Sequence, residues 1–196
     1  MGTRGLFGFR KNGQDKAVYN HYDSYVEGLG KDFLSFILLN KETLDGFFEK
    51  IHEINPHTSP SPEVIDYCKE MGWYNEAVSE QSPQDWYCLL YGLQGLREWQ
   101  RCIDLKKDVF IENYIHFIKD SLFCEYAYIY DIDTHTFEFY KGFQTEPDEK
   151  NRYGMQNDRG YYPCKLCCTI DMTKEINITE TVQKMRETLR KSITHD

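Results

Sequence analysis

The first thirty residues contain the side chains whose types and spacing could form a reactive site. Arg4, His21 and Asp23 supply a guanidinium, an imidazole and a carboxylate. A carboxylate can fix the tautomer of a histidine so that the ring acts as a general base, and an arginine can hold an anionic substrate or a developing oxyanion. Thr3 or Ser24 would supply the hydroxyl nucleophile. These residues predict a hydrolase-like site with His21, Asp23, Arg4 and Thr3 as catalytic groups.

A β-hairpin is the element that would bring these groups together. Asn12 and Gly13 lie between two runs rich in apolar and aromatic residues, which is the strongest short-range signal of a hairpin turn. If they are the two loop residues, Arg4 lies opposite His21, and alternation along the strands places Asp23 on the same face. A longer loop would shift this register by about two residues.

The remaining polar and glycine residues of this segment are predicted to bind a ligand. They are Tyr19, Asn20, Ser24, Gly28 and Gly30. Gly28-Leu29-Gly30 precedes a predicted helix as an anion-binding loop does, but lacks the lysine of a phosphate loop. In the alternative structural interpretation, Arg4 and Asp23 form a cross-strand ion pair, while Asn20 and Ser24 satisfy backbone groups of a turn. The structural interpretation weighs more, because clustered polar groups are also common in scaffolds.

The same segment resembles the beginning of a family of fungal, bacterial and phage proteins that has no assigned activity. The family pattern reads Gly-Thr-Arg-Gly, then Tyr-Asn-His-x-Asp-Ser-Tyr-Pro, then Gly-Leu-Gly. The chain matches it at residues 2–5, 19–25 and 28–30, with Val26 in place of the proline. The similarity extends through residues 85–87 and 126–131. Phage relatives imply an alternative function, in which a non-enzymatic interaction protein binds and inhibits a host protein or sequesters a small molecule.

Length, charge and composition limit the classes of protein and of partner. A chain of 196 residues with 40% hydrophobic residues predicts one globular domain over residues 1–196. A net charge of −9 opposes binding to nucleic acid and to anionic membranes. The expected partner is therefore a small molecule or a protein. The 15 tyrosines and 12 phenylalanines favour half-buried aromatic surfaces, some of which would serve as interfaces. No pattern predicts the oligomeric state.

Cysteine usage and the absence of an export signal favour a cytoplasmic protein with reduced thiols. Seven cysteines are present, and the longest apolar run, residues 33–39, is too short to span a membrane. Cys164, Cys167 and Cys168 form a Cys-x-x-Cys pair with an extra neighbour, and zinc would need two further ligands. We favour the alternative, in which they are small core residues of a strand. No metal or other cofactor is predicted.

Hydrophobic periodicity predicts strands at both ends of the chain and helices between them. Helices are expected over residues 28–40, 44–54, 62–72, 86–96 and 104–122, strands over 125–131, 136–142 and 161–172, and a final helix from Asn177 or Thr179. Residues 82–85 read as a capping box for the 86–96 helix, and residues 144–160 as a long polar loop. Tyr126, Tyr128 and Tyr130 share one strand face, either packed under a helix or exposed to a partner.

The order of the elements predicts an α+β domain. The N-terminal and C-terminal hairpins would form one mainly antiparallel sheet around a helical middle. The order also suits the αββα layers of N-terminal-nucleophile hydrolases, a likeness of fold that does not carry function. Such an enzyme needs its nucleophile as the first residue, whereas removal of Met1 would expose Gly2.

Overall fold

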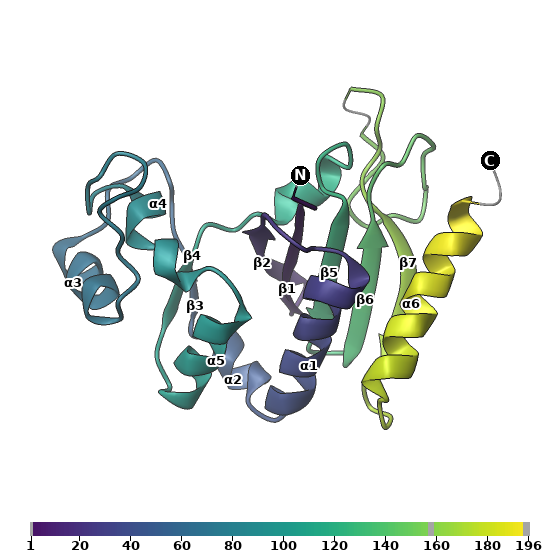
Figure 1. Cartoon of the computed structure of the whole chain (residues 1–196), viewed down its shortest axis with the longest axis horizontal. Helices are drawn as coiled ribbons and strands as arrows, with labels where there is room; N and C mark the ends of the chain where they lie inside the picture. Colours follow the sequence, from purple (N-terminus) through teal and green to yellow (C-terminus); the bar gives the residue numbers. More distant parts are fainter. Residues whose placement is uncertain (1, 157–158, 194–196) are drawn as a thin grey trace. The chain divides into compact units, whose positions relative to one another are not determined.

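The computed structural model describes residues 2–156 and 159–193, and contacts within the chain divide it into two compact units (Figure 1). Unit 1 combines residues 1–48 with 113–196, and unit 2 consists of residues 49–112, inserted between them. Unit 1 holds a mixed, mostly antiparallel sheet with helices, which confirms the α+β prediction. One domain over residues 1–196 stays a prediction, since two compact units can fold together or separately.

Unit 1 is built on a five-stranded sheet with the order β2-β1-β5-β6-β7. Its strands are β1 (Gly5–Lys11), β2 (Gln14–Asn20), β5 (Tyr126–Asp131), β6 (Thr136–Lys141) and β7 (Lys165–Asp171). β1 and β5 are parallel, and the other neighbours are antiparallel. This is one sheet layer within the described residues of unit 1. The stacked pair of sheets in N-terminal-nucleophile hydrolases is therefore not formed there.

The predicted N-terminal hairpin is present with the predicted register. Gly5 pairs with Asn20 and Lys11 with Gln14, and the loop residues Asn12 and Gly13 have φ angles of 50° and 77°. Two positive φ angles are typical of the tight turn that Asn-Gly favours, because its twist matches that of the strands. The ladder ends at Gly5 and Asn20, so Arg4 and His21 lie just beyond it.

One face of the sheet is apolar and aromatic. Phe33 of α1 (Lys31–Asn40) lies with its ring 5.2 Å from Phe7 and 6.0 Å from Phe137. Tyr128 and Tyr130 of β5 are at most 1% exposed, which confirms packing in the core rather than presentation to a partner. The final helix, α6 (Ile178–Ile193), contacts β7 and α1 (Figure 1).

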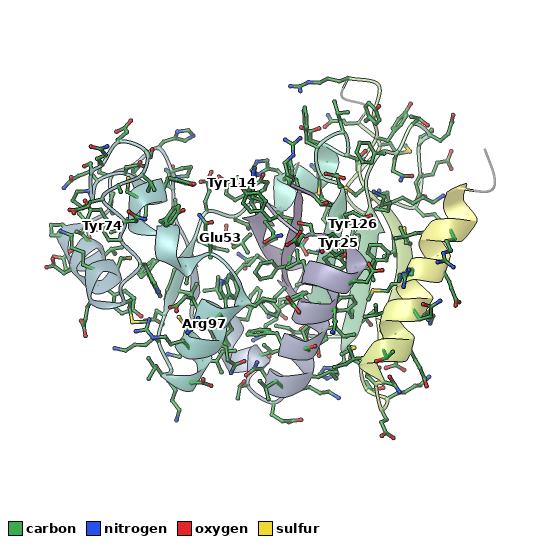
Figure 2. The ribbon with its side chains drawn as sticks, in the orientation of Figure 1. Tyr25, Glu53, Tyr74, Arg97, Tyr114 and Tyr126 are labelled. Carbon is green, nitrogen blue, oxygen red and sulfur yellow. The ribbon has the colours of Figure 1, made fainter. Side chains whose placement is uncertain are left out.

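The edge strand β2 is covered by side chain and backbone from residues 113 and 114. Asn113 accepts a hydrogen bond from the Ala17 amide through Oδ1 (3.1 Å) and donates to the Asp15 carbonyl through Nδ2 (2.7 Å). The Tyr114 amide donates to the Ala17 carbonyl at 2.8 Å; the side chain of Tyr114 is labelled in Figure 2. Covering an edge in this way satisfies backbone groups that would otherwise pair with another chain.

Unit 2 contains short helices and one pair of strands. Its elements are β3 (Ile51–Glu53), α3 (Pro62–Glu70), α4 (Trp86–Leu89), the 3₁₀ turn η2 (Tyr91–Leu93), α5 (Leu96–Asp104) and β4 (Val109–Ile111). Ser61, which precedes Pro62, caps α3 by accepting a hydrogen bond from the Val64 amide. None of the helices in the described part of the chain has the length and apolar character needed to cross a membrane.

The helix predicted over residues 86–96 is wrong, because the chain breaks twice within it. Asp85, not Ser82, caps α4. Gly92 packs against the backbone of Trp73, where an added Cβ would lie 2.8 Å from the Trp73 Cα, and Gly95 has a φ of 89°. A close backbone approach and a left-handed glycine therefore override the apolar periodicity.

Two further predicted helices are wrong in part, because each contains a strand. The helix expected over residues 44–54 ends with α2 (Leu44–Phe48), and Ile51 begins β3. The helix expected over residues 104–122 contains β4, which pairs with β3 in parallel, and the 3₁₀ turn η3 (Ile115–Lys119). The pairing partners lie far apart in the sequence, so a local pattern cannot register them.

Candidate functional site

The described contacts of Arg4 are with Phe123 and Glu125, and Asp23 is not among them. Its guanidinium carbon lies 4.7 Å from the ring centroid of Phe123, within cation–π range. Its backbone amide donates to Glu125 Oε1 at 3.2 Å, and its carbonyl accepts from the Glu125 amide at 3.0 Å. These bonds continue the β1–β5 pairing one residue further and hold Arg4 on the side of β5.

His21 and Asp23 do not form the predicted acid–imidazole pair among the described contacts. The partner of His21 Nδ1 is the hydroxyl of Tyr19 at 2.6 Å, and its ring packs edge-on against Tyr22 at 4.4 Å. Asp23 is exposed and has a φ of 52°, and its carbonyl accepts the Leu29 amide at 2.8 Å. Because β2 ends at Asn20 and Asp23 adopts a left-handed φ, the strand alternation on which the prediction depended does not reach Asp23.

The two candidate hydroxyl residues differ in their burial and in their contacts. Ser24 is fully buried, and its Oγ accepts a hydrogen bond from Asn20 Nδ2 at 2.8 Å. Asn20 Nδ2 also donates to the Tyr22 carbonyl. Thr3 is half-buried, and its carbonyl accepts the Ser24 amide at 3.2 Å. Asn20 and Ser24 thus close the turn after β2, as the structural interpretation of these residues expects.

Gly28 and Gly30 allow close packing, and their amides are occupied. A Cβ on Gly28 would lie 2.2 Å from the Asp23 carbonyl oxygen, and one on Gly30 would lie 2.8 Å from the Tyr128 ring. The amides of Gly28 and Gly30 donate to the Tyr25 carbonyl at 3.1 and 3.3 Å. An anion-binding loop needs free amides, so this turn lacks its main donors.

The cysteine cluster is split between the core and the surface of β7. Cys164 is fully buried, and its Sγ lies 3.2 Å from the carbonyl oxygen of the equally buried Cys124. Cys167 and Cys168 are half-buried. Across the described residues there is no group of three or more His, Cys, Asp and Glu side chains placed to hold a metal ion.

A charged network that no sequence motif predicted lies on the face of the sheet opposite α1. Arg152 reaches Glu138 with two contacts of 2.6 Å, and its Cζ lies 5.0 Å from the Tyr153 ring centroid. Tyr140 donates to Glu138 at 2.9 Å, and burial raises its pKa. Arg10 pairs with Asp15 at 2.8 Å. The hairpin register places Arg10 opposite Asp15 and could have revealed that pair; no local signal marks Arg152.

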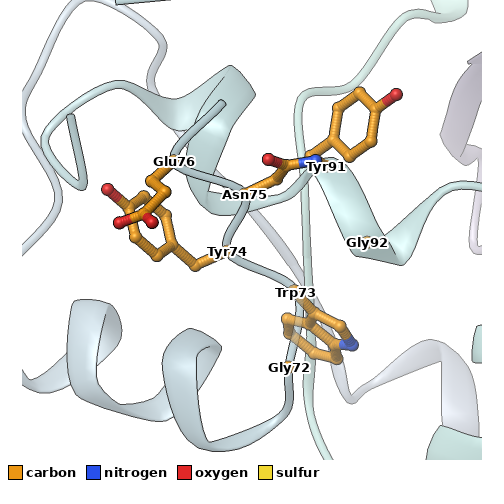
Figure 3. Close-up of a pocket in the computed structure, with 7 residues that line it drawn as sticks. All are labelled: Gly72, Trp73, Tyr74, Asn75, Glu76, Tyr91 and Gly92. Carbon is orange, nitrogen blue, oxygen red and sulfur yellow. The ribbon is translucent and has the colours of Figure 1, made fainter. Parts of the chain in front are cut away.

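Unit 2 contains a pocket of about 360 Å³ (Figure 3). Its lining consists of Gly72, Trp73, Tyr74, Asn75, Glu76, Tyr91 and Gly92. The loop after α3 and the beginning of η2 form it, joined by bonds from the Asn75 amide to the Cys88 carbonyl (2.9 Å) and from the Gly92 amide to the Trp73 carbonyl (2.7 Å). The buried Trp73 donates to Glu98 at 3.3 Å, which fixes one wall.

Glu76 is the one charged residue of this lining. Figure 3 shows the Glu76 carboxylate next to the ring of Tyr74. The pKa of Tyr74 is raised, mainly by partial burial and secondly by the negative charge of Glu76. The Tyr74 hydroxyl therefore stays neutral. Tyr91 is 36% exposed, and its ring packs edge-on against Tyr87 at 5.8 Å. No motif in the sequence predicted this site, although residues 70–96 combine several aromatic residues with no Lys or Arg.

Comparisons with models of protein families, with curated proteins and with solved structures found no match. The resemblance of residues 2–5, 19–25 and 28–30 to a family of fungal, bacterial and phage proteins therefore stays a prediction. The function of the chain is inferred instead from the geometry of the hairpin and of the unit 2 pocket.

Proposed function

We propose that this protein is a non-enzymatic binding protein that engages a partner through the pocket of unit 2. The observation that carries the proposal is the pocket itself, which combines an open volume of about 360 Å³ with two tyrosines, an amide and a carboxylate. Ligand sites are typically concave, largely aromatic or apolar, and supplied with a few polar groups that orient the ligand. Tyrosine suits such a surface because one end of the side chain is apolar and the other is polar.

The hairpin supports this choice over the hydrolase-like alternative. A nucleophile needs a base within hydrogen-bonding reach, and that base needs a group to orient it. The imidazole of His21 contacts the Tyr19 hydroxyl, and the buried Ser24 hydroxyl contacts Asn20. Arg4 lies over Phe123. The Tyr19–His21 and Asn20–Ser24 contacts lie at the turn after β2, Arg4 contacts Phe123 instead, and the predicted relay is not among the described contacts.

The test is an NMR titration of the ¹⁵N-labelled full chain with N-acetyl amides of arginine, lysine, glutamate, leucine and phenylalanine. We expect at least one probe to shift the amide signals of Tyr74, Asn75 and Gly92. Tyr91→Ala should abolish the shifts. Tyr25→Ala is the matched control, because Tyr25 is a 39% exposed tyrosine of unit 1 and is not one of the residues that line the pocket.

The competing function has its own readout. Two results together would refute the binding proposal. The wild type would hydrolyse p-nitrophenyl acetate and His21→Ala would not, and the probes would shift signals of residues 19–25 but none in the pocket. We expect His21→Ala to leave both the probe titrations and the fold unchanged, because its imidazole is exposed.

A further inference from the structure

We infer that the unit 2 pocket recognises a guanidinium group, presented by an arginine side chain of a partner protein. The inference rests on the proposed function and adds the chemistry of the ligand. It is carried by three features of the described residues: the charge of the segment that forms the pocket, the rings and carboxylate that line it, and its size.

The segment that forms the pocket carries acidic residues and no basic ones. Residues 70–96 include Glu70, Glu76, Glu80 and Asp85 and contain no Lys or Arg. All seven lining residues fall within this stretch. Unit 2 as a whole carries twelve Asp and Glu against six Lys and Arg. Such a field raises the local concentration of cations and repels carboxylates, so it favours a positively charged ligand.

The lining offers a cation two kinds of contact at once. The face of the Tyr74 ring attracts positive charge, and the Glu76 carboxylate, drawn beside that ring in Figure 3, accepts charge-assisted hydrogen bonds. Lys69 of α3 already places its Nζ 5.3 Å from the Tyr74 ring centroid, although it does not line the pocket. The ring therefore already attracts a cation. Lys69 also adds a positive charge that opposes an incoming one.

Size and shape favour guanidinium over a compact ammonium. A pocket of about 360 Å³ lies at the small end of ligand sites, large enough for one long side chain and part of its backbone. A planar guanidinium can stack on a tyrosine ring while its edge donates to a carboxylate such as Glu76. An ammonium is more strongly hydrated and cannot stack, so it would use the same pocket less well.

The experiment compares N-acetyl-arginine amide with N-acetyl-citrulline amide, which has nearly the same shape without the charge, and with N-acetyl-lysine amide. Each is titrated into the ¹⁵N-labelled full chain and followed at Tyr74, Asn75 and Gly92. We expect arginine to bind roughly fivefold more tightly than citrulline, and lysine to fall between them, as one cation–π contact and one exposed ion pair allow.

Three variants assign the effect to charge at the pocket. Glu76→Gln should weaken arginine binding roughly twofold to fourfold, because it removes the ion pair and keeps the cation–π contact, and should leave citrulline binding nearly unchanged. Glu70→Gln removes the same charge from an exposed residue of α3 that does not line the pocket. It should change arginine binding by less than about twofold. Lys69→Ala should strengthen arginine binding, because it removes the opposing charge.

The outcomes separate this inference from the proposed function. Equal binding of arginine and citrulline, or no effect of Glu76→Gln, would overturn recognition of a cation while leaving the pocket as a binding site. Tighter binding of lysine than of arginine would overturn the choice of guanidinium. If no probe of any charge shifts the pocket signals, both the inference and the proposed function fail.

Discussion

Replacing Arg152 by alanine tests whether the charged network on the sheet stabilises unit 1. Arg152 makes two contacts of 2.6 Å to Glu138 and a hydrogen bond of 2.9 Å to the Tyr153 hydroxyl. The side chain of Glu138 is 9% exposed and that of Arg152 is 28% exposed. The substitution leaves a buried carboxylate without its main counter-charge.

The expected loss of stability lies between the values for a fully buried and a fully exposed ion pair. Removing one partner of a fully buried ion pair costs about 3–5 kcal/mol, whereas an exposed pair contributes about 0.2–1 kcal/mol. Arg152 is partly exposed, and Tyr140 continues to donate to Glu138 at 2.9 Å. We therefore expect Arg152→Ala to lower the free energy of unfolding by about 2–3 kcal/mol.

Native-state hydrogen exchange of the β6 amides is the suitable assay, because it measures the free energy of opening of that strand. All three tryptophans lie in unit 2, so tryptophan fluorescence would report on the other unit. Arg97→Ala, at an exposed arginine of unit 2, is the control and should change β6 protection by less than about 0.5 kcal/mol. When Glu138 is already replaced by Gln, Arg152→Ala should lower the free energy of opening of β6 by at least about 1 kcal/mol less than it does in the wild type. Equal losses in both backgrounds, or a loss no larger than that of Arg97→Ala, would refute the stabilising role of the ion pair.

Two further predictions concern packing and pH. Gly30→Ala should destabilise unit 1 by about 1–3 kcal/mol, because its Cβ would lie 2.8 Å from the Tyr128 ring; urea unfolding followed by far-UV circular dichroism measures this. Gly46→Ala in α2 is the control and should be neutral or stabilising, because no atom lies within 4 Å of its added Cβ. Equal effects of the two substitutions would contradict this account. Burial raises the pKa of Cys68 to about 12 and that of Cys102 to about 11, from an ordinary value of 9.0. The unfolded thiols therefore ionise first, so stability is full below pH 9 and falls as pH rises towards 11–12. Tryptophan fluorescence in urea at pH 8, 9.5 and 10.5 should show the fall, and Cys102→Ala should lessen it; an unchanged pH dependence would contradict the prediction.

The N-terminal hairpin and the caps of α3 and α6 could be predicted because the information is local. Asn12 and Gly13 accept positive φ angles, and this alone sets which residues pair along β1 and β2. Ser61 before Pro62 determines the start of α3 in the same way. Asn177 accepts a hydrogen bond from the Glu180 amide at 3.2 Å, as the predicted start of the final helix requires.

The candidate site at the hairpin was predicted by residue type, but its geometry depended on a distant contact. Strand alternation would have kept Asp23 on the face of His21. Gly28 instead packs onto the Asp23 carbonyl, and Asp23 turns into the left-handed region. The turn at Asp23 and its close contact with Gly28 lie beyond the end of β2, so alternation within that strand carries no record of them.

The sequence by itself determined the Asn12-Gly13 turn, the caps of α3 and α6, the acidic charge and the mixture of helices and strands, because each depends on neighbouring residues or on composition. Only the tertiary structure decided that Arg152 reaches Glu138, that β3 pairs with β4, and that the loop after α3 meets η2 to open a pocket. Each of these contacts joins segments with no shared periodicity. Their selection depends on shape and charge in the folded chain.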